Sequence, residues 1–305
     1  MQKRAARRFH RTLLKWYRTE GRAFPWRQTR DPYHILVSEV MLQQTQASRV
    51  LEKYPQFIHR FPTPKNLARA RRRTVILAWQ GMGYNNRAVR LYALARTIMA
   101  RHGGVVPVNH DALVSLPGIG RYTANAILSF AFRRRVPVVE TNIRRVLSRV
   151  LFRMRRSSDL SEPAVIWQEA AGLLPERRSH DWNQALMDLG AMVCTARNPH
   201  CDHCPVSSLC ASSGVMSAPA ETEPKREPSF SGIPNRIYRG RIVELLRDTG
   251  NRKGITISRL GRGLHNNFRP ANLTWLRSLI NSLERDGLVS VTNRNSSGGG
   301  TVRLA

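Results

Sequence analysis

The sequence predicts a helical protein in two parts: an all-α region over residues 1–212 and a small α+β region over residues 233–305. In the first part, apolar residues recur at spacings of three and four, without the sustained alternation of strands. In the second part, three helical patterns precede two short strand-like segments. A length of 305 residues allows about two domains, and a hydrophobic share of 41% is ordinary for globular proteins.

Each helix of the first part is predicted from its own apolar stripe. The segments, in chain order, are HILVSEVMLQQ, NLARARRRTVILAWQ, RLYALARTIMA, TANAILSFAF, IRRVLSRVLF, AVIWQEAAGLL and NQALMDLGAMV. The opening MQKRAARRFHRTLLKWYRTEGR is amphipathic and lacks the apolar core and cleavage site of a signal peptide. No run approaches the roughly 18 apolar residues of a membrane helix. We therefore expect a soluble intracellular protein, cytoplasmic and associated with the nucleoid.

Residues 213–232 separate the two parts and are predicted to form a linker, because they contain three prolines and no apolar periodicity. The second part begins with three helical segments, RIYRGRIVELLRDTG, ITISRLGRGL and NLTWLRSLINSLERDG, and ends in a hairpin of LVSVTN and GGGTVRLA. This order predicts a winged-helix-like module. Such a module suits duplex DNA binding, and a helical cap or a partner-docking module is the alternative.

The charge of the chain is its most unusual property. Fifty basic residues face twenty acidic ones, which leaves a net charge of +30 and predicts a polyanionic partner, most often nucleic acid. Only six of the basic residues are lysines, and there is none between Lys65 and Lys225. Arginine cannot act as an amine nucleophile at neutral pH. A mechanism through a Schiff base therefore has few candidates in the middle of the chain.

All four cysteines lie in one short segment with the spacing Cys194-x6-Cys201-x2-Cys204-x5-Cys210. In an intracellular protein this clustering predicts a metal site, and four thiolates suit either tetrahedral zinc or an iron–sulfur cluster. The 6-2-5 spacing after a helix that ends in GAMVC resembles the 4Fe–4S loop of the endonuclease III and MutY-type DNA glycosylases.

A second motif, Leu116-Pro117-Gly118-Ile119-Gly120, precedes Arg121-Tyr122-Thr123-Ala124 and an apolar helix. Two glycines allow a tight turn that points amide groups and a helix N-terminus at a phosphate, although the same residues could form a plain turn between helices. In this setting LPGIGRYTA resembles the helix-hairpin-helix of the same superfamily. That resemblance implies a grip on DNA that does not read its sequence, with Leu116, Gly118, Gly120 and Arg121 as contacts.

Further motifs extend the resemblance over residues 9–212. FPWR, RDPY, SEVMLQQT, GMGY, LPGIGRYTA, NQALMDLGA and the cysteine loop follow one another in the order and at roughly the spacing of MutY-type adenine glycosylases. A Glu on a helix is normally a solvated surface charge, but here Glu39 matches the family's catalytic acid. A positioned carboxylic acid can protonate a purine, which is otherwise a poor leaving group.

The resemblance also assigns the other residues of the site. Tyr122 stands where strand-cutting members carry their Schiff-base lysine, which implies a monofunctional enzyme that uses water as the nucleophile. Tyr84 matches the aromatic wedge beside the opposing base, and inserted side chains of this kind offset the cost of base flipping. The remaining DNA-contact positions, which surround the flipped base or the gap it leaves or belong to the FPWR and SEVMLQQT motifs, are Trp26, Arg27, Leu42, Gln43, Gln44, Thr45 and Gln184.

The chain departs from the family pattern in two places. The family's second carboxylate is an Asp in a D-T-N sequence that stabilises the sugar cation, whereas here the sequence is Glu140-Thr141-Asn142. Glu140 keeps the charge but has one more methylene, so we expect either an adjusted catalytic geometry with Asn142 beside it or a plain surface Glu. The second departure is residues 233–305, which are too short and too helical for the family's usual Nudix-like domain.

Three functions follow. The first is an adenine DNA glycosylase that binds mismatched or lesion-bearing duplex DNA as a monomer, carries a 4Fe–4S cluster, and excises adenine opposite 8-oxoguanine or guanine. The second is a glycosylase for T or U opposite G, since related enzymes share the hairpin, the cluster and a Tyr at the position of Tyr122. The third is a catalytically impaired DNA-binding protein, which only Glu140 favours.

Overall fold

The structure of the chain, a computed structural model, describes residues 1–154, 162–215, 227–248, 254–292 and 299–305. The chain forms two compact units, and each is built from segments that are distant in sequence. The first unit contains residues 1–36, 107–115 and 119–223, and the second contains residues 37–106, 116–118 and 224–305. No helix within the described ranges is long and apolar enough to cross a membrane.

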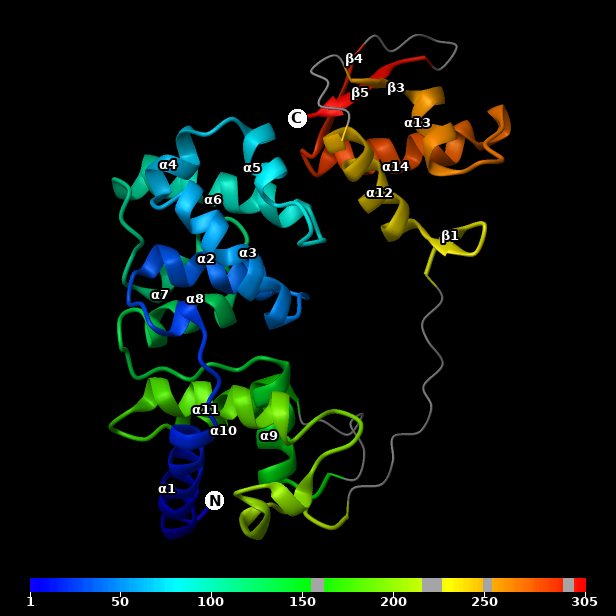
Figure 1. Ribbon diagram of the computed structural model, residues 1–305. Helices are drawn as coiled ribbons and strands as arrows, with labels where there is room; N and C mark the ends of the chain where they lie inside the picture. Colours follow the sequence, from blue (N-terminus) through cyan, green and yellow to red (C-terminus); the bar gives the residue numbers. More distant parts are fainter. Residues whose placement is uncertain (155–161, 216–226, 249–253, 293–298) are drawn as a thin grey trace. The chain divides into compact units, whose positions relative to one another are not determined.

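The first unit is helical throughout the part that the structure describes (Figure 1). Its long helices are α1 (Lys3–Glu20), α8 (Arg121–Phe130), α9 (Thr141–Leu151), α10 (Pro163–Gly172) and α11 (Ser179–Met192), with the shorter α7 (His110–Val114) packed against α8. Helix α11 is central, since α1, α8 and α9 all contact it. The cysteine segment follows α11 and contains two 3-10 turns, η3 (Cys201–His203) and η4 (Ser207–Leu209).

The core of the first unit is an aromatic and aliphatic cluster around α11. Trp182 of α11 is 1% exposed, and the ring of Phe9 from α1 lies edge-on to it at 4.7 Å between centroids. Leu147 of α9 and Val206 of the cysteine segment belong to the same cluster. The cysteine segment is therefore anchored to the helices by apolar packing as well as by its own turns.

The second unit begins with part of α2 (Pro32–Leu42) and continues through α3 (Ala47–Arg60), α4 (Pro64–Arg69), α5 (Arg72–Ala78) and α6 (Asn86–His102). A single helix was expected over NLARARRRTVILAWQ, but the backbone is extended at Ala70 and Arg71. Leu67 and Ile76 are both fully buried. They would lie about 180° apart on a continuous helix of 3.6 residues per turn. The break lets both side chains be buried.

The rest of the second unit is a C-terminal lobe with three helices and a small sheet. Its helices are α12 (Asn235–Asp248), α13 (Ile257–Leu264) and α14 (Leu273–Arg285), with a 3-10 turn η5 (Pro270–Asn272) before α14. Strands β4 (Val289–Thr292) and β5 (Thr301–Leu304) form the expected antiparallel hairpin, and its tip lies outside the described residues. The sheet order is β3-β5-β4, so β3 (Ile255–Thr256) adds a strand where the sequence pattern predicted only helix.

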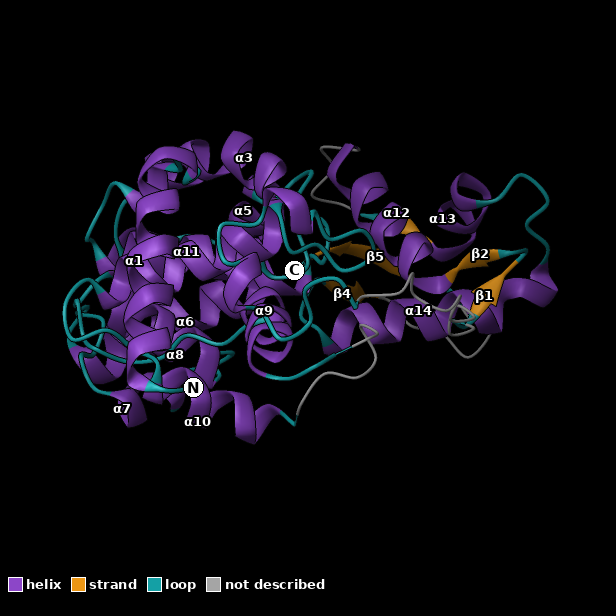
Figure 2. Cartoon of the chain, turned by 90° about the horizontal axis from the view of Figure 1, so that it is seen from below, coloured by secondary structure: helices purple, strands orange, loops and turns teal. Residues whose placement is uncertain are grey.

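The C-terminal lobe starts earlier than the apolar pattern indicated. Residues 216–226 of the expected linker lie outside the described residues, but β1 (Ser229–Phe230) pairs with β2 (Ile233–Pro234). The two-residue turn between them has positive φ at Ser231 and Gly232, as in the tight turns of hairpins. Phe230 stacks on Trp275 of α14 at 3.9 Å between ring centroids. Figure 2 shows strands only in this part of the described chain, which confirms an all-α N-terminal region.

Candidate active site

Helix α2 carries the predicted acid in an apolar setting. Residues 35–41 are all buried, and Glu39 has only 5% of its surface exposed. The Asp31 carboxylate caps the start of α2, where it accepts hydrogen bonds from the backbone amides of Tyr33 (2.8 Å) and His34 (3.0 Å). An ionised carboxylate is costly to bury, so a Glu on such a helix is a sign of function. The structure therefore removes the interpretation of Glu39 as a solvated surface charge.

Two loops of the second unit carry Gln44 and Tyr84, which are expected to contact the orphan base, the base left without a partner when adenine flips out. Arg87 of α6 ties the two loops together. After α2, Gln44 is exposed with φ of 56°, and after α5, Tyr84 is 50% exposed with φ of 41°. Positive φ is strained for residues other than glycine and persists where the surroundings enforce it. The guanidinium group of Arg87, which is 3% exposed, supplies that enforcement. It donates to oxygens at the end of α2 and in both loops, namely those of Val40, Met41, Gln43, Thr45 (Oγ1), Met82 and Gly83.

This arrangement also places the other predicted residues of the SEVMLQQT motif. Leu42 and Gln43 are half-buried. Thr45 Oγ1 accepts from Arg87 Nη2 at 2.7 Å and donates to the carbonyl of Met82 at 3.3 Å, so it links the two loops. Burial lowers the pKa of Arg87 to about 10, which still leaves it charged at neutral pH. The result is a rigid pair of loops that presents Gln44 and Tyr84 to solvent.

The predicted hairpin is present between α7 and α8. Gly118 has φ of +77°, a left-handed conformation that side chains resist, while Leu116 is buried. Gly120 forms the N-cap of α8. Helix N-termini of this kind can bind a phosphate through their first backbone amides. Arg121 is exposed and its guanidinium group lies 4.0 Å from the centroid of the Trp167 ring, whereas Tyr122 is half-buried.

Glu140 forms the N-cap of α9. Its carboxylate accepts from the amides of Asn142 (2.7 Å) and Ile143 (2.9 Å) and from the side chain of Asn142 (3.1 Å). Burial raises the pKa of Glu140, and these hydrogen bonds together with the charge of Arg145 oppose that rise. Glu140 is thus half-buried and fixed in position rather than a free surface residue.

A chain of hydrogen bonds runs from Glu140 to the cysteine segment. Asn142 donates to Glu140 and accepts from Arg145 Nη2 at 2.7 Å. Arg145 also donates to the carbonyls of Gly190 (2.6 Å) and Cys194 (2.8 Å). A Cβ at Gly190 would lie 2.7 Å from Cβ of Asn142, so α9 and α11 approach this closely only because residue 190 is glycine.

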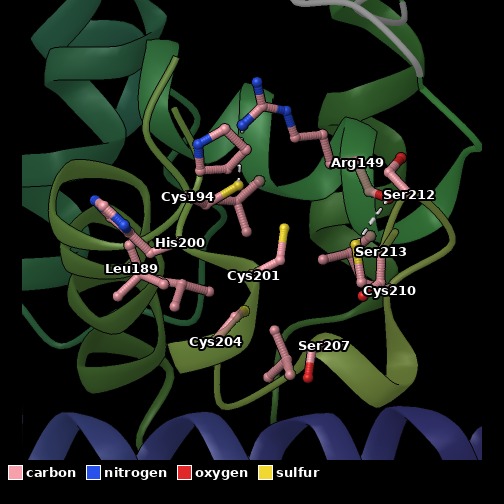
Figure 3. A pocket seen from close by; sticks show the side chains of 15 residues that line it. Arg149, Leu189, Cys194, His200, Cys201, Cys204, Ser207, Cys210, Ser212 and Ser213 are labelled. Carbon is pink, nitrogen blue, oxygen red and sulfur yellow. Dashed lines mark hydrogen bonds between the residues drawn. The ribbon is translucent and has the colours of Figure 1, made fainter. Parts of the chain in front are cut away.

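The four cysteines surround one hollow, as Figure 3 shows. The hollow has a volume of about 20 Å³. Among the described residues, no three Cys, His, Asp or Glu side chains converge on a point where one metal ion could sit. The ligands of a 4Fe–4S cluster each bind a different iron and so surround a volume. Four thiols around one hollow provide the donor set of a 4Fe–4S cluster.

The chemistry around the sulfurs agrees with this fit. Burial raises the pKa of Cys204 to about 11 and also raises those of Cys201 and Cys210, so these thiols stay protonated until a metal displaces the protons. The buried Arg149 donates to Sγ of Cys194 at 3.3 Å and to the carbonyl of Thr195 at 2.7 Å. A positive charge against the sulfurs would stabilise thiolate ligands. A bound cluster would tie this segment together.

Arg27 and Trp26 of the short helix η1 (Pro25–Arg27) serve internal packing. The two terminal guanidinium nitrogens of Arg27, Nη1 and Nη2, contact the fully buried Asp188 at 2.7 and 2.9 Å. Arg22 contacts the same carboxylate. Burial acts to raise the pKa of Asp188, but the hydrogen bonds and charges of the two arginines prevail and lower it. Trp26 is buried and stacks on Phe24 at 4.7 Å.

The structure brings predicted residues together in two groups. In the second unit, Gln44, Thr45 and Tyr84 lie on loops joined by Arg87. In the first unit, Arg145 connects Asn142, and through it Glu140, to the cysteine segment. Gln184 of α11, also in the first unit, accepts a hydrogen bond from the Tyr17 hydroxyl at 2.6 Å. The residues that the sequence analysis missed are Arg87, Arg145, Arg149 and Asp188. Asp188 had a visible signal, since it interrupts an apolar helix.

Comparison with known proteins defines the class. Residues 37–168 match the HhH-GPD superfamily of base excision DNA repair proteins, and residues 194–210 match the iron–sulfur binding domain of endonuclease III. The fold and the site thus define a helix-hairpin-helix DNA glycosylase with an iron–sulfur domain.

Individual relatives define the family. An adenine DNA glycosylase of Mycobacterium tuberculosis is 43% identical over 239 residues, which is 77% of either chain. The chain belongs to the adenine DNA glycosylase family. A thymine/uracil-DNA glycosylase of Methanothermobacter thermautotrophicus is 34% identical over 67% of this chain and 92% of its own length. The solved structure of a thermostable thymine-DNA glycosylase has a TM-score of 0.64 at 33% identity, covering 68% of this chain and 96% of its own.

Proposed function

We propose that this protein removes adenine paired with 8-oxoguanine or guanine by hydrolysing its N-glycosidic bond. The observation that carries the proposal is Glu39, a carboxyl group buried in the apolar helix α2 close in sequence to the exposed Gln44. The family relation at 43% identity supports adenine as the substrate.

The chemistry divides between two carboxyl groups. Glu39 donates a proton to the departing purine, which lowers the barrier to breaking the bond. The Glu140 carboxylate, held by the amides of α9, stabilises the positive charge that develops on the sugar. Water is the nucleophile, because Tyr122 replaces a lysine and no lysine lies between Lys65 and Lys225. The enzyme is therefore monofunctional.

Binding of DNA uses the remaining groups. The hairpin with Gly118 and Gly120 holds a backbone phosphate at the start of α8. Tyr84 and Gln44 occupy the gap on the strand opposite adenine, with Leu42 and Gln184 near the flipped nucleotide. We place this reaction in the cytoplasm, on nucleoid DNA, with one protein molecule per site.

A second candidate is excision of T or U opposite G. It is favoured by the thymine/uracil-DNA glycosylase relative, which this chain matches along nearly the whole of that relative's length.

One panel of duplexes separates these functions. Single-turnover excision is measured on A:8-oxoG, A:G, T:G and U:G pairs, with A:T as the control. The proposal predicts rapid release of adenine from the first two and none from T:G or U:G. Release of T or U with adenine untouched would establish the second candidate. Borohydride should trap no covalent adduct, and a robust adduct would contradict the monofunctional mechanism.

A further inference from the structure

The second unit contains an open groove, and the proposed reaction uses residues from only one of its walls. Its volume is about 680 Å³. One wall consists of the two loops held by Arg87, including Gln44, Thr45 and Tyr84. The other wall belongs to the C-terminal lobe, with Arg236, Ile237, Arg239 and Gly240 of α12 and with Leu283 and Leu288.

The second wall is fixed to the first by a shared core and by buried polar contacts. Ile76 of α5 belongs to the hydrophobic cluster of the lobe, alongside Tyr238 and Leu279. Arg247 of α12 is 6% exposed and donates to the carbonyl of Ile76 (2.7 Å) and to Oδ1 of Asn85 (3.0 Å). The groove is thus a built feature of the unit, because the lobe cannot shift without unpairing a buried guanidinium group.

The lining of the groove has the chemistry of a protein surface that binds nucleic acid. Its charged residues are Arg49, Arg236 and Arg239, and none of the described residues that line it is acidic. Arg239 is paired with Asp286, which lies outside the lining. Arg236 is 60% exposed and is paired at its Nε with Glu227, which leaves other donors of its guanidinium group for a phosphate. The groove also has apolar surface for a base, since Tyr84 is 50% exposed and Ile237 is 38% exposed.

We propose that the C-terminal lobe forms the second wall of the site for the strand opposite the excised base, with Arg236 on a backbone phosphate and Ile237 against the orphan base. This inference rests on the proposed function, because Gln44 and Tyr84 mark the orphan-base gap only if the chain acts on a mispair. A basic, partly apolar groove suits a nucleotide strand better than a protein helix, which would need a mostly apolar surface. The lobe thereby takes part in recognition rather than serving as a cap.

Disulfide trapping locates the strand. Ile237→Cys in the full-length protein is mixed with duplexes that carry a thiol tether on the nucleotide opposite adenine or, in a second duplex, on the adenine strand. We expect a cross-link with the first duplex alone. The controls are the parent protein and Arg259→Cys, at an exposed position of α13 outside the groove. Cross-linking equal to that of Arg259→Cys would overturn the proposal.

Equilibrium binding tests the two contacts separately. Arg236→Ala should make the salt dependence shallower by about 0.9 in the log–log slope, as loss of one phosphate contact requires. Ile237→Ala should weaken binding about fivefold without changing that slope, because it removes apolar contact equivalent to roughly 1 kcal/mol. Arg259→Ala is the charge-matched control. Wild-type affinity and slope in both variants would overturn the proposal.

Two different measurements distinguish the role of the lobe from the proposed function. Excision by the wild-type protein on the duplex panel tests the function, whereas the variants are compared in binding. A wild-type enzyme that releases adenine while both variants bind normally refutes only the role of the lobe. A wild-type protein that releases no adenine refutes the function.

Discussion

Two regions of the molecule are organised around a buried arginine, and they differ in what that arginine holds. Arg87 connects the loop after α2 with the loop between α5 and α6. It donates to oxygens of Val40 at the end of α2, of Thr45 in the first loop and of Met82 in the second. Arg145 connects the cap of α9 to the cysteine segment through Asn142 and Cys194. In the first region the partners belong to α2 and to the two loops. In the second, one partner is the backbone carbonyl of Cys194, whose thiol is a predicted cluster ligand.

A bound cluster would therefore support only one of the two regions. The loops with Gln44 and Tyr84 keep their positions by covalent connection and hydrogen bonds alone. The Glu140 cap depends, through Asn142 and Arg145, on a segment that the bound cluster would hold together. We therefore expect the cofactor to support one half of the chemistry and to leave the other half unaffected.

Loss of the cluster should have the largest effect and should divide the two regions. Cys204→Ser removes one ligand, because a hydroxyl group is a poor substitute for a thiolate at iron. The brown colour of the cluster, with its absorbance at about 400 nm, should disappear. Amide hydrogen exchange should accelerate over residues 141–151 and 194–213 but stay slow over residues 37–45 and 82–92.

The control for this experiment is Ser207→Ala, a change at another residue that lines the hollow. If Cys204→Ser loses protection from hydrogen exchange equally in both regions, the Arg87 region also depends on the cluster. That result would contradict the expected difference between the two regions.

Replacing Arg87 should have the next largest effect, this time confined to the second unit. Arg87→Met leaves several buried carbonyls without donors, and each such group costs about 1–3 kcal/mol. We expect a loss of about 3 kcal/mol in the free energy of unfolding, after partial rehydration of the loops. The measurement is urea denaturation, with Arg90→Met at an exposed position of α6 as the control. Equal stability of the two variants would contradict the role of Arg87.

The titration of Glu140 should have the smallest effect. Burial raises its pKa above the usual 4.5, so the folded protein binds this proton more tightly than the unfolded chain does. Stability therefore falls as the pH rises from about 4.5 through the folded pKa, where the buried group must ionise. Glu140→Gln removes this dependence. The check is the difference in unfolding free energy between wild type and variant across that range, and a difference that grows in the opposite direction would refute the burial argument.

The sequence predicted the parts of the molecule that depend on local pattern. The cysteine spacing, the LPGIG turn and most helices follow from residues close together in the chain. The break between α4 and α5 was missed, because it follows from the need to bury Leu67 and Ile76 together. Strand β3 was missed because two residues become a strand only through pairing with β5.

The arginine network was harder to predict for a different reason. Among 44 arginines, nothing in the sequence distinguishes Arg87 or Arg145 from those on the surface. Their burial is decided by which way α6 and α9 turn when they pack. Arg27 is the opposite case, a residue that the sequence singled out for another role. The family resemblance marked it as a DNA contact, and in the structure it forms an ion pair with the buried Asp188.

We propose that the buried carboxyl group of Glu39 on α2 drives the removal of adenine, and Glu39→Gln removes its proton-donating ability. The amide keeps the size of the side chain but cannot deliver a proton. On an A:8-oxoG duplex, we expect the single-turnover rate to fall by about 10²- to 10⁴-fold, with the dissociation constant nearly unchanged. Glu52→Gln, at an exposed position of α3, is the matched control and should excise at the wild-type rate. A near-wild-type rate in Glu39→Gln would contradict the claim and place the acid elsewhere.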